Sequence, residues 1–101
     1  MPNTSREKLS DAAISAAVAF LPDWSVKNGK LHREYKFADF PHAMGFMMTA
    51  TAGIEKMNHH PEWANVYNRV TVDLMTHDAG GITRLDVELA QFLEGIAKKL
   101  L

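Results

Sequence analysis

Three histidines are the residues of this sequence best suited to chemistry: the adjacent pair His59-His60 and, farther along the chain, His77. An imidazole gains and loses a proton near neutral pH, and its neutral form also binds metal ions. Three imidazoles that share one cleft could therefore transfer protons or hold a metal ion. The two other histidines, His32 and His42, fall at an exposed strand position and in a first helical turn, where we expect solvent to surround them.

Metal binding is the weaker of the two possibilities. Neighbouring histidines such as His59 and His60 point their side chains in divergent directions, and the helical spacing of the ligands in zinc enzymes is missing. The chain also has no cysteine, which excludes thiolate ligands, cysteine nucleophiles and disulfides. We therefore expect no bound metal.

A carboxylate stands close to the histidine pair in the sequence. Glu55 lies four residues before His59, so the two share one face of a helix if the helix extends that far. The carboxylate could then accept an imidazole N–H and fix the tautomer of the ring. The alternative is an exposed pair that contributes little. Because Pro61 ends any helix here, we expect the histidines at a helix-to-strand corner, from which side chains can reach a cleft.

Periodic apolar residues predict the elements that position these side chains. Thr4 and Glu7 have the spacing of a helix capping box, and a first helix is expected from about Ser5 to Phe20. Its apolar face would consist of Leu9, Ala13, Ala16 and Phe20. Residues 24–37 alternate apolar and polar on either side of Asn28-Gly29, which predicts a β-hairpin.

The second half of the chain repeats this arrangement. A helix capped by Asp39 is expected to reach about Asn58 and so to carry Glu55. Two strands are predicted at 63–67 and 70–77, joined by a turn at Asn68-Arg69. In this arrangement His77 ends the last strand, just before a flexible loop at 78–81.

A final helix should begin at Thr83, because Thr83 and Asp86 again have capping-box spacing. Its apolar face would consist of Leu85, Leu89, Phe92, Ile96 and Leu100. The predicted order is thus helix, two strands, helix, two strands, helix. Short turns between strands favour antiparallel pairs, and amphipathic helices must cover one face of the sheet. We therefore expect an α+β fold, with residues 1–101 forming a single domain.

Composition and charge argue against several functions. The net charge is −1 and no lysine-arginine cluster is present, which disfavours direct binding of nucleic acid. No apolar run approaches the ~18 residues of a membrane span. The apolar segment 12–21 follows Arg6 and Lys8 as in a signal peptide, but no cleavage site follows it. A cytoplasmic protein is the expectation.

The residues around the histidines match a family pattern. The run Glu55 to Trp63 (EKMNHHPEW), then Asn65 to Asn68, Thr76-His77 and Asp86, resembles the pterin-4a-carbinolamine dehydratases. The spacing agrees as well, since nine residues separate Tyr67 from His77 and eight separate His77 from Asp86. The resemblance is densest over residues 55–93 and extends more loosely to the whole chain.

This resemblance implies a four-stranded antiparallel sheet covered on one face by three helices, in agreement with the predicted order. It also implies assembly as a homodimer or homotetramer. The implied reaction removes water from a 4a-hydroxytetrahydropterin and gives the quinonoid dihydropterin. Its usual purpose is to recycle a tetrahydrobiopterin-type cofactor for an aromatic amino acid hydroxylase.

Histidine suits the implied reaction. The hydroxyl on C4a leaves readily only after it receives a proton, while N5 must lose one, and imidazoles can do both near neutral pH. The nitrogen lone pair assists the departure, so neither a metal nor an organic cofactor is required. By this resemblance His59 and His77 are candidate general acids at the hydroxyl. His60 would bind the pterin and accept the N5 proton, and Glu55 would orient a ring.

The resemblance also implies a set of substrate-binding residues: His59, His60, Pro61, Trp63, Thr76, His77 and Asp78. The backbone of Thr76-His77-Asp78 would meet the amide-like edge of the pterin. Trp63 has a core or wall position as its alternative, and Asp86 is explained at least as well by its role as a possible structural cap.

A second function remains open at this point. Some animal members of the family also act as dimerisation cofactors of a homeodomain transcription factor, so the chain could be a non-enzymatic protein-interaction module. The complete set of His59, His60 and His77 favours the enzyme, because an interaction module would not need all three.

Overall fold

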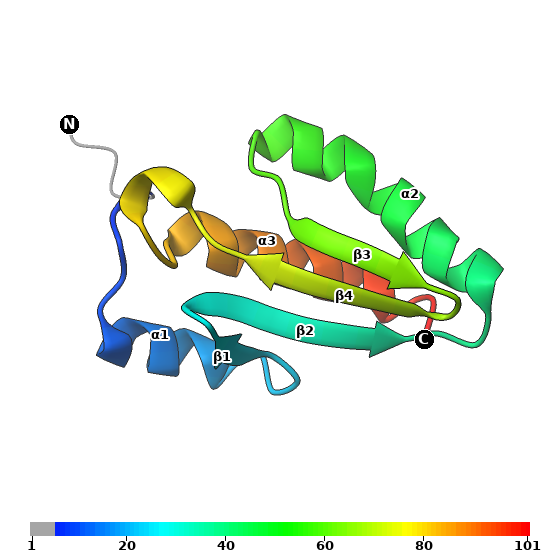
Figure 1. Cartoon of the computed structure of the whole chain (residues 1–101), viewed down its shortest axis with the longest axis horizontal. Coiled ribbons are helices and arrows are strands. Elements are labelled where there is room, and N and C mark those ends of the chain that lie inside the picture. Colours follow the sequence, from blue (N-terminus) through cyan, green and yellow to red (C-terminus); the bar gives the residue numbers. More distant parts are fainter. Residues whose placement is uncertain (1–5) are drawn as a thin grey trace.

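The structure, a computed structural model, describes residues 6–101. It contains one four-stranded sheet in the order β1-β2-β4-β3, with every neighbouring pair antiparallel (Figure 1). The elements in chain order are α1 Asp11–Val18, β1 Ser25–Lys27, β2 Lys30–Lys36, α2 Phe40–Met57, β3 Glu62–Val66, β4 Arg69–Leu74, a short 3-10 helix η2 His77–Ala79, and α3 Arg84–Ala97. The predicted α+β fold and the order of its helices and strands are confirmed.

One face of the sheet packs against helices α2 and α3, and the core lies between these layers (Figure 1). The two central strands contribute fully buried side chains to it: Leu31, Tyr35, Val70, Val72 and Leu74. The helices contribute Ala43, Phe46, Ala50, Leu89 and Leu93. The alternate residues of these strands are at most half-buried, so the period-two pattern marked the buried face correctly. Within residues 6–101, no helix is long and apolar enough to cross a membrane.

The first helix is shorter than predicted. It begins at Asp11 with Ser10 as its cap, whereas Thr4 and Ser5 of the predicted start lie outside the described residues. Leu9 precedes the helix because its backbone N–H donates to the carbonyl of Ile82, 2.9 Å away, and joins the chain to the segment before α3. The predicted apolar face is only partly correct. Leu9 packs against the core as predicted, but Phe20 is 85% exposed, and Ile14 and Val18 also contact the core.

The hairpin and the second helix form as predicted. Asn28 and Gly29 both have positive φ angles, 54° and 74°, as a tight two-residue turn requires. Asp39 caps α2 by accepting the backbone N–H of His42 at 2.9 Å. The helix ends at Met57, and Asn58 adopts the left-handed conformation, with φ 50°. The chain therefore turns sharply just before the histidine pair.

The second strand pair differs in detail from the prediction. The turn lies at Tyr67-Asn68, with a positive φ at Tyr67, one residue earlier than expected. The last strand ends at Leu74, so the prediction that His77 ends it is wrong. Thr76 forms an isolated bridge with Gly81, and the carbonyl of Thr76 accepts from three later backbone N–H groups. The expected flexible loop is therefore a hydrogen-bonded turn that begins with His77.

Helix α3 begins at the predicted capping box, in which Thr83 and Asp86 satisfy each other's backbone groups. Its most buried face is rotated from the predicted one. Leu89, Ala90, Leu93 and Ala97 are fully buried, whereas the other members of the predicted face are half-buried. The rotation brings the carboxylate of Asp86 into the interior, where it has no solvent exposure.

Glu94 ties the C-terminal half of α3 to the sheet. Its Oε1 accepts hydrogen bonds from Tyr35 Oη at 2.6 Å, Trp24 Nε1 at 2.8 Å and Arg33 Nε at 3.2 Å. Burial by itself would raise the pKa of Glu94, but these three donors outweigh it and hold the pKa below its usual value. Burial and the neighbouring carboxylate raise the pKa of Tyr35 far above its usual range.

We predict that Glu94→Gln lowers the free energy of unfolding by about 2 kcal/mol, because charge-assisted hydrogen bonds to two buried aromatic residues become neutral ones. Urea denaturation at neutral pH measures the loss. Glu88→Gln is the matched control, since Glu88 is exposed on the same helix and its one ion-pair partner among residues 6–101 is Arg84, at 3.5 Å. Equal midpoints for the two variants would contradict this account of Glu94.

The stabilising contribution of Glu94 depends on pH. Because folding lowers the pKa of Glu94 from an ordinary value of 4.5, its stabilising contribution is complete above that pH and is lost as the pH falls through the folded-state pKa. The difference in stability between the wild type and Glu94→Gln should therefore shrink as the pH is lowered from about 5 to about 3. A difference that grows in acid would be inconsistent with the lowered pKa.

Candidate active site

All three candidate histidines line one pocket. The pocket has a volume of about 230 Å³ and is lined by Arg6, Asn58, His59, His60, Met75, Thr76, His77 and Asp78. Two segments form most of it: the turn that follows α2 and the 3-10 turn that follows β4. The structure therefore brings His77 close to the His59-His60 pair, although these residues are far apart in the sequence.

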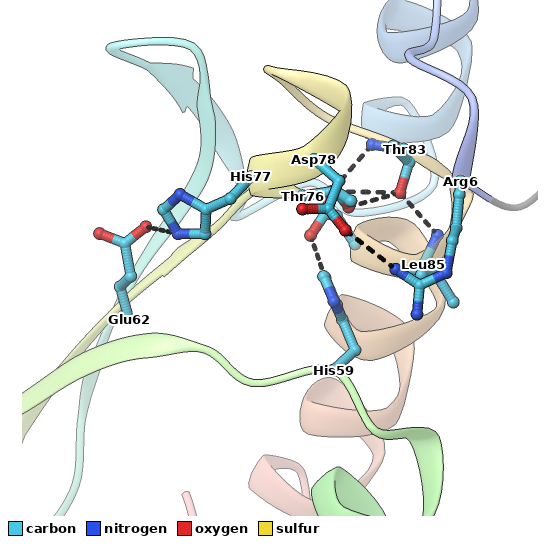
Figure 2. A network of polar contacts seen from close by, with 9 residues as sticks. Arg6, His59, Glu62, Thr76, His77, Asp78, Thr83 and Leu85 are labelled. Carbon is cyan, nitrogen blue, oxygen red and sulfur yellow. Dashed lines mark hydrogen bonds and ion pairs between the residues drawn. The ribbon is translucent and has the colours of Figure 1, made fainter.

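His59 is held by a buried carboxylate. Its Nε2 lies 2.5 Å from Oδ1 of Asp86, and His59 itself is only 8% exposed. The other oxygen of Asp86 accepts from the backbone N–H of Thr83 at 2.8 Å and from the hydroxyl of Thr76 at 3.0 Å. Figure 2 shows His59 pointing from the turn after α2 toward Thr76 and Thr83. Asp86 is thus a helix cap, as its spacing indicated, and in addition the partner of His59.

Glu55 pairs with His60. The four-residue spacing had suggested a pair with His59, and that prediction is wrong. Oε1 of Glu55 lies 2.6 Å from Nε2 of His60, and both side chains are more than half exposed. The reason is the left-handed residue Asn58, which ends the helix at Met57, before it can include His59 and form the predicted pair. The side chain of His59 is then directed toward Asp86 in α3, and the side chain of His60 lies beside Glu55.

His77 is the most exposed of the three imidazoles, with 76% of its side chain accessible. Its Nε2 lies 3.6 Å from Oε2 of Glu62, the first residue of β3, and Figure 2 shows the ring turned toward that carboxylate. Each pocket histidine therefore has Nε2 beside a different carboxylate. Within residues 6–101, no hydrogen-bond partner occupies Nδ1 of these three rings, so Nδ1 is the nitrogen left for a ligand.

The pocket includes only part of the predicted substrate-binding set. His59, His60, Thr76, His77 and Asp78 line it, but Pro61 and Trp63 do not. Trp63 is half-buried and packs edge-on against Phe46, with ring centroids 6.3 Å apart, which matches its alternative as a core residue.

Three lining residues lie outside the predicted substrate-binding set: Arg6, Asn58 and Met75. Arg6 reaches the pocket from the segment before α1 and lies 3.9 Å from Asp78, and Met75 follows β4. No periodicity or motif marks Arg6, because its position depends on how the N-terminal segment crosses the fold.

The pocket presents imidazoles to a ligand, but its side chains within residues 6–101 do not form a metal-binding cluster. In the part of the chain that the structure describes, no group of three or more histidine, cysteine, aspartate or glutamate side chains could hold a metal ion. The physical reason is that Nε2 of each imidazole is directed to a different carboxylate, so the three Nε2 atoms do not converge on one point.

The fold and this pocket define a small α+β protein with a histidine-lined polar site, and comparison with known proteins makes the class specific. The family model described as pterin 4 alpha carbinolamine dehydratase matches residues 7–96. A protein of Solibacter usitatus, named as a candidate pterin-4-alpha-carbinolamine dehydratase, is 61% identical over 90 residues, covering 89% of this chain and 95% of its own. A protein of the same name from Bradyrhizobium diazoefficiens is 48% identical over 94 residues. The match covers 91% of this chain and 94% of the Bradyrhizobium protein.

A solved structure agrees with these relatives. The crystal structure of a protein from Brucella melitensis, described as a transcriptional coactivator/pterin dehydratase, superposes with a TM-score of 0.86 at 41% identity. The match covers 90% of this chain and 99% of the Brucella chain. The chain described here belongs to the pterin 4 alpha carbinolamine dehydratase family.

The geometry of Asp86 predicts the tautomer of His59. An ionised carboxylate only accepts hydrogen bonds, so Nε2 of the neutral ring must carry the proton. In Asp86→Asn the side-chain amide can donate to Nε2 instead, and the proton should move to Nδ1. Nitrogen NMR of the labelled protein distinguishes the two tautomers. His32 and His60, which have other carboxylate partners, are internal controls and should not change. A His59 ring that keeps its proton on Nε2 in the variant would contradict the assignment.

Proposed function

We propose that this chain dehydrates a 4a-hydroxytetrahydropterin to the quinonoid dihydropterin by proton transfer from and to histidine. The observation that carries the proposal is the single pocket that His59, His60 and His77 share. Membership of the dehydratase family and the names of the relatives support the substrate class. The exposure of His60 and His77 supports direct contact with a ligand that enters from solvent.

The proposed reaction needs one proton delivered and one removed. A histidine donates a proton to the hydroxyl on C4a, and the C4a–O bond breaks to release water. The N5–H bond gives its proton to a second histidine, and its electron pair forms the double bond between N5 and C4a. General acid–base catalysis of this kind typically accelerates a reaction by about 10²–10⁴-fold. No electron leaves the pterin in this step, so no redox partner takes part.

We assign the acid role at the hydroxyl to His77 and His59, and the base role at N5 to His60. His59 can exchange a proton with the ligand only through Nδ1, because Asp86 occupies its Nε2, so it can donate only as the imidazolium, in which both ring nitrogens carry a proton. His60 is likewise held at Nε2 by Glu55, which makes Glu55 the orienting carboxylate of the base. Thr76 and Asp78 line the same pocket and are proposed to bind the ring edge of the pterin.

We further propose that the chain acts without a metal or organic cofactor, as a homodimer or homotetramer in the cytoplasm, and that it recycles the pterin of an aromatic amino acid hydroxylase. Large apolar side chains that lie exposed on the single chain support self-association, among them Phe40, Met48, Val66 and Tyr67. The hydroxylase role rests on the usual role of the family to which the chain belongs.

A second function is favoured by one finding. The Brucella protein is described as a transcriptional coactivator as well as a pterin dehydratase. A protein-interaction role would use outer surfaces of the molecule and not the histidine pocket, so it would survive substitutions of His60. The chain has a net charge of −1, and such a role would therefore rest on protein contacts and not on direct binding of nucleic acid.

Dehydration of chemically generated 4a-carbinolamine, followed by absorbance, tests the enzymatic proposal. The wild type should accelerate the reaction, and His60→Ala should lose at least about 10²-fold of that acceleration. His42→Ala is the matched control, because His42 is also an exposed histidine paired with a carboxylate, Asp39, but lies outside the pocket. A wild-type protein without activity, or equal activity of the two variants, would refute the proposal. Stoichiometric metal in the active sample would refute the metal-free mechanism.

A further inference from the structure

We propose that Glu62 is a positioning residue that orients His77, and that Lys30 holds Glu62 in place for this purpose. The inference rests on the proposed function, since it concerns the orientation of one of its three histidines. It extends the site beyond the pocket to the first residues of β2 and β3, which do not line that pocket.

His77 needs an external restraint more than the other two histidines. His59 is buried against Asp86, and His60 has Glu55 at 2.6 Å, but His77 begins an exposed turn with 76% of its side chain accessible. An unrestrained imidazole samples several rotamers, and only some of them can reach a reacting atom. Within residues 6–101, Glu62 is the one carboxylate that lies within 4 Å of its ring nitrogens, with Oε2 3.6 Å from Nε2. Contacts of this kind are often loose before the substrate binds and tighten in the complex.

Glu62 is itself fixed by a second contact. Its Oε1 accepts a hydrogen bond from Nζ of Lys30 at 2.8 Å, and only 28% of the Lys30 side chain is exposed. Lys30 begins β2 and Glu62 begins β3, while β4 lies between these strands in the sheet. The lysine therefore reaches across β4 to hold one oxygen of Glu62. The other oxygen stays free to face His77.

Stability alone explains Glu62 poorly. In the register of β3 and β4, Glu62 stands directly opposite Asp73 on the polar face of the sheet. Like charges in this position repel each other, and the ion pair with Lys30 offsets little of this repulsion, because the Glu62 side chain is 42% exposed. Asp73 already has a partner of its own in His32, at 2.8 Å. A carboxylate at this unfavourable position is explained by its reach to His77.

The kinetic test compares Glu62→Gln in two backgrounds. In the wild-type background we expect kcat to fall about three- to five-fold with little change in KM, the factor that a single exposed ion pair can supply. In a His77→Ala background the same substitution should have no further effect, because the ring that it orients is gone. Glu34→Gln is the matched control: Glu34 lies on the same face of the sheet and pairs only with Arg69, at 4.0 Å. It should leave kcat unchanged.

A spectroscopic test needs no activity and separates this inference from the proposed function. Three-bond couplings of the labelled His77 side chain report how its χ1 rotamers are populated. We expect one dominant rotamer in the wild type and in Glu34→Gln, and averaged couplings in Glu62→Gln and Lys30→Met. Averaged couplings already in the wild type would overturn the proposal. So would an unchanged kcat in Glu62→Gln, or an equal loss of kcat with and without His77. An inactive wild type with an ordered His77 would count against the proposed reaction and leave the positioning role standing.

Discussion

The buried carboxylate of Asp86 is the constraint on which the candidate site depends. It accepts hydrogen bonds from the backbone of Thr83 at the start of α3 and from Thr76 at the end of the β4 segment, and it pairs with His59 after α2. A fully buried charge that lost one of these partners would cost several kcal/mol. Three segments that are distant in the sequence must therefore stay together. His77 directly follows Thr76, so the same carboxylate also fixes the place from which His77 enters the pocket.

Helix α3 is attached to the sheet by an acidic residue at each end. Asp86 holds the first turn at the histidine corner, and Glu94 holds the last turns through Trp24 and Tyr35. Both carboxylates belong to the interior and receive several donors. The carboxylates that pair with the exposed histidines, Glu55 and Glu62, have one or two partners and remain accessible. The two interior carboxylates thus hold the fold together, and Asp86 at the same time fixes the ring of His59.

The sequence predicted what depends on local chemistry and missed what depends on tertiary geometry. The turn at Asn28-Gly29 and the capping box that contains Asp86 follow from rules that act within four residues, and both are present. The pairing of Glu55 with His60 could not be predicted, because the left-handed conformation of Asn58 decides which of the two histidines contacts the last turn of α2. The link from Lys30 to Glu62 spans 32 residues and crosses a strand, so no spacing pattern could announce it.

The central claim is that three histidines face one bound pterin, and proton NMR of the five imidazoles during a titration with a stable reduced pterin tests it most directly. The account predicts that the ring signals of His59, His60 and His77 shift together along one binding curve. The signals of His32 and His42, which lie outside the pocket, should stay in place. Pocket histidines that do not respond, or a shift of His32 as large as theirs, would contradict the claim.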